Sequence, residues 1–109
     1  MANVFTNAKK DLTTNGETVV YTVPASTSGI IKSILVSEDS GNADTITLTL
    51  TDASSNVFSL FKTKSVGANT TIELLSQPIV LQESEIIKAT AATGNRLHIM
   101  LSVLQINRE

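Results

Sequence analysis

The segment TITLTLT, residues 45–51, restricts the possible fold more than any other stretch of the chain. Threonine and aliphatic residues alternate in it without interruption, which is the two-residue period of a β-strand with one covered face. Ile46, Leu48 and Leu50 are expected to point into a core, and the threonines to point the other way. Threonine is β-branched and polar, so it suits a solvated sheet face or one that contacts another subunit.

Similar segments follow one another along the chain, separated by clusters of turn-forming residues. Pro24 closes the first clear strand, because proline lacks the N–H group that a sheet ladder requires. The expected strands cover residues 17–23, 30–38, 45–51, 57–63, 70–76, 78–81, 84–91 and 96–106.

The strand expected at 30–38 carries apolar residues on both faces. Strict alternation places Ile30, Ile34 and Val36 on one side, and Ile31 and Leu35 on the other. A strand of this kind is expected between two covered surfaces. The apolar excess of this strand and of 96–106 also offers surface for contacts between copies of the chain.

About eight strands at a spacing of roughly 8–12 residues predict an all-β fold. The expected architecture is a single antiparallel β-sandwich, jelly-roll-like, that spans residues 1–109. Residues 1–12 precede the first clear strand and leave two alternatives open. They form an N-terminal arm, from Ala2 to Leu12, that contacts a neighbouring subunit, or they add an edge strand to their own sheet. The arm hypothesis rests on Val4, Phe5 and Leu12, which a free tail would leave in water.

The composition argues against several classes of function. The chain has no cysteine, which excludes disulfides, thiolate metal sites and a cysteine nucleophile. Its net charge of −2 comes from scattered residues and not from the basic patch that binds nucleic acid. No apolar run reaches the length of a membrane span, and MANVFTNAKKDL lacks the apolar region of a signal peptide. We expect a protein that is made in a cytoplasm and binds neither nucleic acid nor membranes.

His98 is the only histidine and falls in the last expected strand, on the face that carries Met100 and Ser102. A catalytic triad needs serine, histidine and an acid together, and no local motif indicates one. A nucleophile elbow, a P-loop and an HExxH zinc motif are also missing from the sequence. A structural or surface role is therefore expected for His98, and no catalytic residue is predicted.

Two groups of acidic residues have alternative interpretations. Glu83 and Glu85 would share a strand face roughly 7 Å apart, which overlaps the carboxylate separations of glycosidases. A solvated strand start explains this pair equally well. The turn at 38–44 gathers around a glycine the possible oxygen ligands Glu38, Asp39, Asn42 and Asp44, which could hold Ca²⁺. Their spacing does not match an EF-hand, and a plain turn is expected. No metal or cofactor site is predicted.

Phe58 and Phe61 belong to the strand expected at 57–63 and differ in parity. Alternation would let one of them fill the core while the other faces outward, where an exposed phenylalanine is a natural contact anchor. Coverage of both by the sandwich is an equal alternative. The predicted interface residues are Val4, Phe5, Leu12 and Phe58.

The segment YTVPASTSGIIKSILVSE resembles a segment of small phage virion structural proteins. In those proteins Tyr-Thr-Val-Pro-Ala is followed by a short polar loop and an apolar strand with Lys-Ser-Ile, here Tyr21 to Ala25 and then Ile31 to Ile34. LTDASSNVFSLFKTKSV is also similar to small structural proteins of phages, including phages of cyanobacteria. The resemblance covers roughly two thirds of the chain and carries no catalytic motif. Residues 26–28 are Ser-Thr-Ser where glycine is common, so the turn geometry can differ.

The resemblance implies a non-enzymatic protein of the virion, made in the cytoplasm of the bacterial host. The first expectation is a capsid decoration (cement) protein that bridges neighbouring capsid subunits. A neck, baseplate or tail-fibre component is the alternative. A carbohydrate-binding module with loops at 26–28 or 39–44 is a different class, which the scarcity of aromatic residues disfavours. The expected partners are copies of the chain itself, with a trimer as first guess, and the major capsid protein or other virion proteins.

Overall fold

The computed structural model describes residues 3–107, whose regular structure consists of nine β-strands without a helix. One sheet contains β1 (Asn3–Leu12), β3 (Thr27–Glu38), β6 (Thr71–Glu73), β7 (Ile79–Leu81) and β9 (Leu97–Asn107). The other contains β2 (Thr18–Thr22), β4 (Asp44–Thr51), β5 (Val57–Val66) and β8 (Ile86–Ala91). Within 3–107 there is consequently no helix that could cross a membrane.

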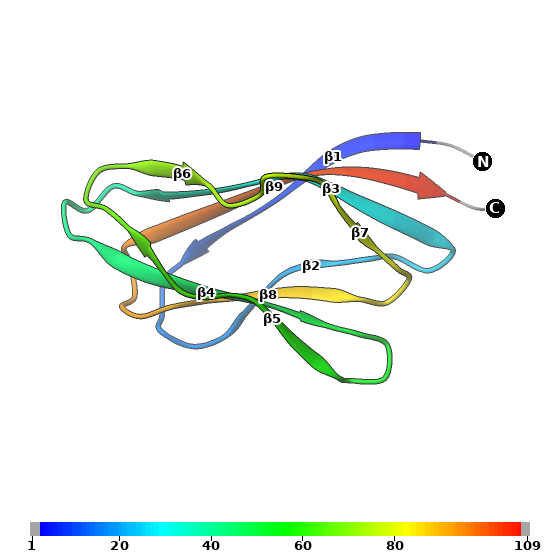
Figure 1. Ribbon diagram of the computed structural model, residues 1–109, viewed down its shortest axis with the longest axis horizontal. Coiled ribbons are helices and arrows are strands. Elements are labelled where there is room, and N and C mark those ends of the chain that lie inside the picture. Colours follow the sequence, from blue (N-terminus) through cyan, green and yellow to red (C-terminus); the bar gives the residue numbers. More distant parts are fainter. Residues whose placement is uncertain (1–2, 108–109) are drawn as a thin grey trace.

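The two sheets face each other, as Figure 1 shows, and buried side chains from both sheets form one core. The five-stranded sheet has the order β1-β9-β3-β6, and β7 also pairs with β3. The four-stranded sheet has the order β2-β8-β4-β5. All pairings are antiparallel, so the predicted antiparallel β-sandwich is confirmed.

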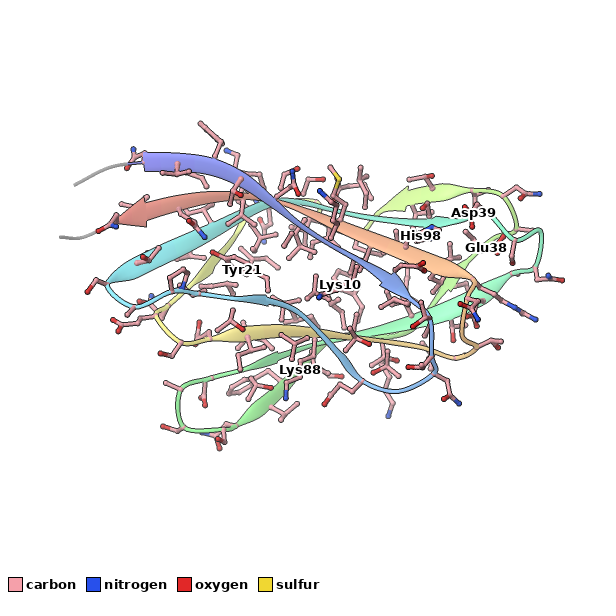
Figure 2. All side chains as sticks on the ribbon, turned by 180° about the vertical axis from the view of Figure 1, so that it is seen from behind. Lys10, Tyr21, Glu38, Asp39, Lys88 and His98 are labelled. Atoms are coloured by element: carbon pink, nitrogen blue, oxygen red, sulfur yellow. The ribbon has the colours of Figure 1, made fainter. Side chains whose placement is uncertain are left out.

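The core consists mainly of aliphatic side chains from both sheets, since the chain has few aromatic residues. Ile46 and Leu48 of β4 are fully buried, as the alternation in TITLTLT predicts. Leu50 packs against the same core but remains partly exposed. The only tyrosine, Tyr21, lies between the sheets, and its hydroxyl accepts a hydrogen bond from Nε2 of Gln105 at 2.8 Å (Figure 2).

A β-bulge interrupts β3 where it pairs with β9. Ile31 lies opposite Val103, but the next paired residue, Ser33, lies opposite Ser102. Lys32 is therefore an extra residue in the ladder, and the alternation of faces shifts by one position after it.

This bulge corrects the predicted faces of β3. Ile31, Ile34 and Val36 are all fully buried on the inner face. The prediction that grouped Ile30 with Ile34 and Val36 is wrong, because it assumed an unbroken strand. Ile30 and Leu35 point outward and are half-buried, so no further layer within residues 3–107 covers that face.

Residues 3–12 form an edge strand, which is the alternative to a free arm. β1 pairs with β9 along its whole length, from Asn3 opposite Ile106 to Leu12 opposite Leu97. Ala2, the first residue of the predicted arm, lies outside the described residues. Leu12 is 1% exposed and belongs to the core, so, contrary to the prediction, it has no surface to offer a partner.

Candidate interaction surface

The outward side chains of β1, β9, β3, β6 and β7 form a surface that we call the outer sheet face. They are arranged in rows that run across the strands, because antiparallel partners point to the same side of a sheet. The pairing registers of the five strands define which residues share a row.

The first of these rows, the apolar row, consists of Phe5, Leu104, Ile30 and Val80, each paired with the next. It spans three strand spacings of about 4.8 Å, which makes it roughly 14 Å long. Phe5 is 76% and Val80 59% exposed, and the two residues between them are half-buried. Large exposed apolar side chains gathered in one place are typical of an interaction site.

A second row, the charged row, consists of Lys9, Met100, Leu35 and Glu73. It carries a cation at one end, an anion at the other and two apolar side chains between them. Met100 is 39% exposed. This row is therefore apolar in its middle, like the apolar row, but has opposite charges at its two ends.

The carboxylate at the end of the charged row is held by three donors. Burial would raise the pKa of Glu73, but hydrogen bonds from the Ser33 hydroxyl and from the backbone N–H groups of Ile34 and Leu75 outweigh that effect. The pKa of Glu73 is consequently lowered. This end of the row stays negatively charged at neutral pH.

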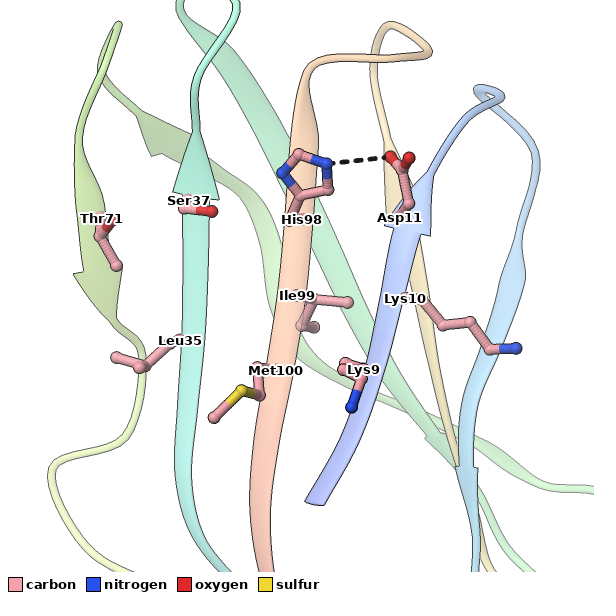
Figure 3. A pocket seen from close by; sticks show the side chains of 9 residues that line it. All are labelled: Lys9, Lys10, Asp11, Leu35, Ser37, Thr71, His98, Ile99 and Met100. Carbon is pink, nitrogen blue, oxygen red and sulfur yellow. Dashed lines mark ion pairs between the residues drawn. The ribbon is translucent and has the colours of Figure 1, made fainter.

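A groove of about 550 Å³ lies on the outer sheet face and includes most of the charged row. Figure 3 shows Met100 and Leu35 side by side, with His98 and Ser37 closer to the end of the sheet. The lining comes from β1, β9, β3 and β6: Lys9, Lys10, Asp11, Leu35, Ser37, Thr71, His98, Ile99 and Met100.

Asp11, His98 and Ser37 follow one another across three strands, since both Asp11 and Ser37 pair with His98. The three residues follow the order of a Ser–His–Asp triad, but they do not make the contacts of a triad. Nε2 of His98 lies 3.2 Å from Oδ1 of Asp11 (Figure 3). Its Nδ1 lies 3.7 Å from Oδ2 of Asp39. Both ring nitrogens face carboxylates, so neither is placed to take a proton from Ser37. The arrangement instead links β1, β9 and the turn after β3.

The turn that could have held Ca²⁺ is organised by Glu38, which lies at the same end of the molecule as His98 and Asp39 (Figure 2). Glu38 is 2% exposed, and its carboxylate accepts backbone hydrogen bonds from Ser40 at 2.8 Å, Gly41 at 3.2 Å and Asn69 at 2.9 Å. The hydroxyl of Ser40 also donates to it. These donors occupy both carboxylate oxygens, and residues 3–107 contain no cluster of three or more metal-ligating side chains.

The same donors determine the charge of this carboxylate. Burial would raise the pKa of Glu38, but the hydrogen bonds from Ser40, Asn69 and Gly41 prevail and lower the pKa to about 2. Because Asn69 belongs to a different turn, ionised Glu38 connects the loop after β3 to the loop before β6.

The two glutamates near the start of β8 do not form the strand pair that their spacing allows. Glu83 lies in a turn and not in a strand, so the two-residue strand spacing does not apply to it. Oε1 of Glu85 accepts a hydrogen bond from the backbone N–H of Gln82 at 2.7 Å. Its contact is thus local to the turn.

Phe58 and Phe61 fall on one face of β5 despite their different parity. Leu50 pairs with Phe58 and Leu48 with Phe61, because the ladder between β4 and β5 contains irregularities. The parity that the prediction assumed does not hold across this ladder, but one phenylalanine does pack against the core while the other is exposed, as the first of the two alternatives expects. Phe58 is nevertheless 53% exposed on an edge strand, whereas Phe61 is partly buried against the core.

The threonine face of β4 is less open than the sequence predicts. Thr45, Thr47 and Thr49 are half-buried, and Thr51 is buried. Within 3–107, the hydroxyl oxygens of Thr49 and Thr51 are buried without a hydrogen-bond partner.

The remaining predicted interface residues do not form one patch. Val4 and Phe5 are adjacent on β1 and therefore point to opposite sides, with exposures of 49% and 76%. Phe58 belongs to the other sheet. Only Phe5 lies on the outer sheet face, where it joins residues of β3, β7 and β9. The apolar excess of β3 and β9 is the sequence signal for the residues that lie beside Phe5. The pairing register that places them there cannot be obtained from this signal.

No protein family matches this sequence, and no curated protein is detectably similar to it. Solved structures do share its fold. A chain from the disulfide-linked pili of Bacillus endospore appendages is similar with a TM-score of 0.61 and 6% identity, covering 99% of this chain and 88% of that one. The present chain has no cysteine, so it cannot form such disulfides.

A chain from the acid-stable capsid of Helicobacter pylori bacteriophage KHP30 is similar with a TM-score of 0.59 and 8% identity. The match covers 97% of this chain and 89% of that one. A chain of the cyanophage Pam1 capsid is similar with a TM-score of 0.48 and 13% identity, covering 94% of this chain and 85% of that one. At these identities the likeness concerns the fold alone.

Proposed function

We propose that the chain is a non-enzymatic structural protein of a bacteriophage virion, and specifically a capsid decoration protein that bridges neighbouring capsid subunits. The observation that carries this proposal is the fold shared over nearly the whole length of both chains with a phage capsid chain. The segment at 21–38 that resembles phage virion proteins supports it independently of the fold.

The candidate surface is consistent with this role. The outer sheet face offers exposed apolar side chains, and its histidine is engaged by two carboxylates and not by a serine. Surface complementarity repeated by symmetry is what a shell component needs. Phe5 remains a candidate for contacts with copies of the chain, and Val4 and Phe58 for contacts with the major capsid protein or other virion proteins.

The connectivity supports describing the sandwich as a jelly roll. The chain passes from one sheet to the other at almost every connection, and only β4–β5 and β6–β7 stay within one sheet. Two four-stranded groups connected in this way, β1-β9-β3-β6 and β2-β8-β4-β5, are the arrangement of an eight-stranded jelly roll, a fold common in viral capsids.

A neck, baseplate or tail-fibre component would have the same fold and is the alternative position in the virion. A carbohydrate-binding module is disfavoured because the chain has no exposed tryptophan or tyrosine for a sugar ring to stack on. The chain has no tryptophan, and its only tyrosine, Tyr21, is buried and hydrogen-bonded to Gln105. It cannot stack on a sugar ring.

Electron microscopy of phage particles labelled with an antibody against this protein tests the position. A decoration protein should be labelled over the whole head. Label confined to the neck or tail would favour the alternative component, and unlabelled particles would refute the proposal. Binding of the purified protein to xylan or other glycans would support the carbohydrate-binding class instead.

A further inference from the structure

We propose that the outer sheet face binds the same face of a second copy of this chain. The two copies would be related by a two-fold axis that runs parallel to the strands, between β9 and β3. This inference does not depend on where the protein resides, because it follows from the order of side chains within the rows.

A rotation about such an axis keeps each row opposite its own counterpart but reverses the order within it. In the apolar row, Phe5 of one copy would face Val80 of the other, and Leu104 would face Ile30. Each contact would occur twice, as in every isologous interface. All four side chains would then be covered by apolar partners, although Phe5 and Val80 are more than half exposed in the single chain.

The charged row is self-complementary under the same rotation. Lys9 of one copy would face Glu73 of the other, and Met100 would face Leu35. The cation at one end of the row therefore meets the anion at the other end twice per dimer. Opposite charges placed in this way select the register of an interface as well as the partner.

A two-fold axis perpendicular to the strands fits less well. When centred between the two rows, it would place the apolar row of one copy on the charged row of the other. Lys9 would then face Phe5, and Glu73 would face Val80. Covering a charge with an apolar side chain is costly when no opposite charge lies beside it, so this orientation is disfavoured.

The size of the face is adequate for association. From the row of Phe5 to that of Asp11 is six residues, or roughly 20 Å at about 3.4 Å per residue, and four strands are roughly 19 Å wide. The projected area is on the order of 400 Å², and protruding side chains expose more than the projection. Two such faces packed at about 10 Å with nearly aligned strands would bury roughly 800 Å² in total, or somewhat more, which is the size of a weak and reversible interface.

The oligomeric state tests the proposal first. Sedimentation or light scattering over micromolar concentrations should show a monomer–dimer equilibrium. Phe5→Ser should weaken dimerisation on the order of tenfold or more, because it removes a contact made twice. Phe58→Ser is the matched control, since it removes an exposed phenylalanine from the other sheet, and it should leave the dimer unchanged. Unchanged thermal unfolding of both variants would verify that each one folds.

Crosslinking tests the axis, and the absence of native cysteine gives it a clean background. A Phe5→Cys chain mixed with a Val80→Cys chain should be joined by a short bismaleimide, whereas neither should be joined when alone. If the Phe5→Cys chain were joined to a Lys9→Cys chain and not to the Val80→Cys chain, the proposed axis would be overturned. A protein that stays monomeric at all concentrations would overturn the proposal itself. So would the trimer expected from the sequence, if Phe5→Ser leaves that trimer unchanged.

Discussion

Oε2 of Glu73 accepts a hydrogen bond from the backbone N–H of Ile34 at 2.7 Å, just before regular pairing between β3 and β6 begins at Leu35. The hydroxyl of Ser33 donates to the other oxygen at 2.5 Å. The carboxylate therefore satisfies polar groups beside the bulge at Lys32, where the alternation of β3 shifts. A short edge strand is attached to the sheet by one side chain as well as by its backbone.

Replacing Glu73 with alanine should lower the free energy of unfolding by about 1–2 kcal/mol, since a charged acceptor of three hydrogen bonds is lost. Ser33→Ala removes only one of these bonds and should cost less, about 0.5–1 kcal/mol. Urea unfolding of the three proteins measures both effects. Equal losses would mean that the backbone bonds to Glu73 contribute little.

Glu38 should make the fold sensitive to acid. Its pKa in the folded state, about 2, lies below the ordinary value of 4.5. Its contribution to stability is therefore fully present above about pH 4.5 and is lost as the pH falls toward 2. Glu38→Gln removes this titration, so the stability of the variant should fall less steeply over that range than that of the wild type. Urea unfolding of the two proteins at several pH values measures the slopes. A Glu38→Gln slope equal to that of the wild type would contradict this role.

The two faces of β4 should respond differently to truncation. Leu48 is fully buried, so Leu48→Ala should cost about 2–5 kcal/mol. Thr47 is half-buried, and its hydroxyl accepts one hydrogen bond from the backbone N–H of Thr63. Thr47→Ala should cost about 1 kcal/mol or less. Similar losses in chemical denaturation would show that the outer face of β4 is packed as tightly as the inner one.

Gly94 should not tolerate a side chain. A Cβ at this position would lie 2.6 Å from the carbonyl oxygen of Thr13, a backbone atom that cannot move without shifting the loop after β1. Gly94→Ala should destabilise the protein by about 1–3 kcal/mol. At Gly16 a Cβ would meet only the Thr14 hydroxyl at 3.6 Å, so Gly16→Ala should be nearly neutral. Comparable melting temperatures for the two variants would contradict the steric argument.

Most of the fold could be predicted from local patterns. The alternation in TITLTLT identified the buried Ile46 and Leu48, and the turn clusters separated the strands. The faces of Ile30, Phe58 and Phe61 could not be predicted, because a bulge changes parity without a reliable local signal. For β1 the sequence allows both an arm and an edge strand, since the pairing of β1 with β9 depends on residues about ninety positions away.

The candidate surface was predictable only in part. Phe5 could be identified as an apolar residue outside the clear strands, but the apolar row also needs Leu104, Ile30 and Val80, which three pairing registers bring together. The clamp of His98 between Asp11 and Asp39 likewise joins three separate segments. The spacing of residues in the sequence does not show how strands far apart in the chain are paired.

Quantification of this protein in purified phage particles by mass spectrometry, relative to the major capsid protein, tests the proposed function most directly. A decoration protein should be present on the order of hundreds of copies per particle, in a ratio set by the symmetry of the shell. About 3 to 18 copies would indicate a neck or tail component and contradict decoration. Absence from the particles would contradict a structural role in the virion altogether.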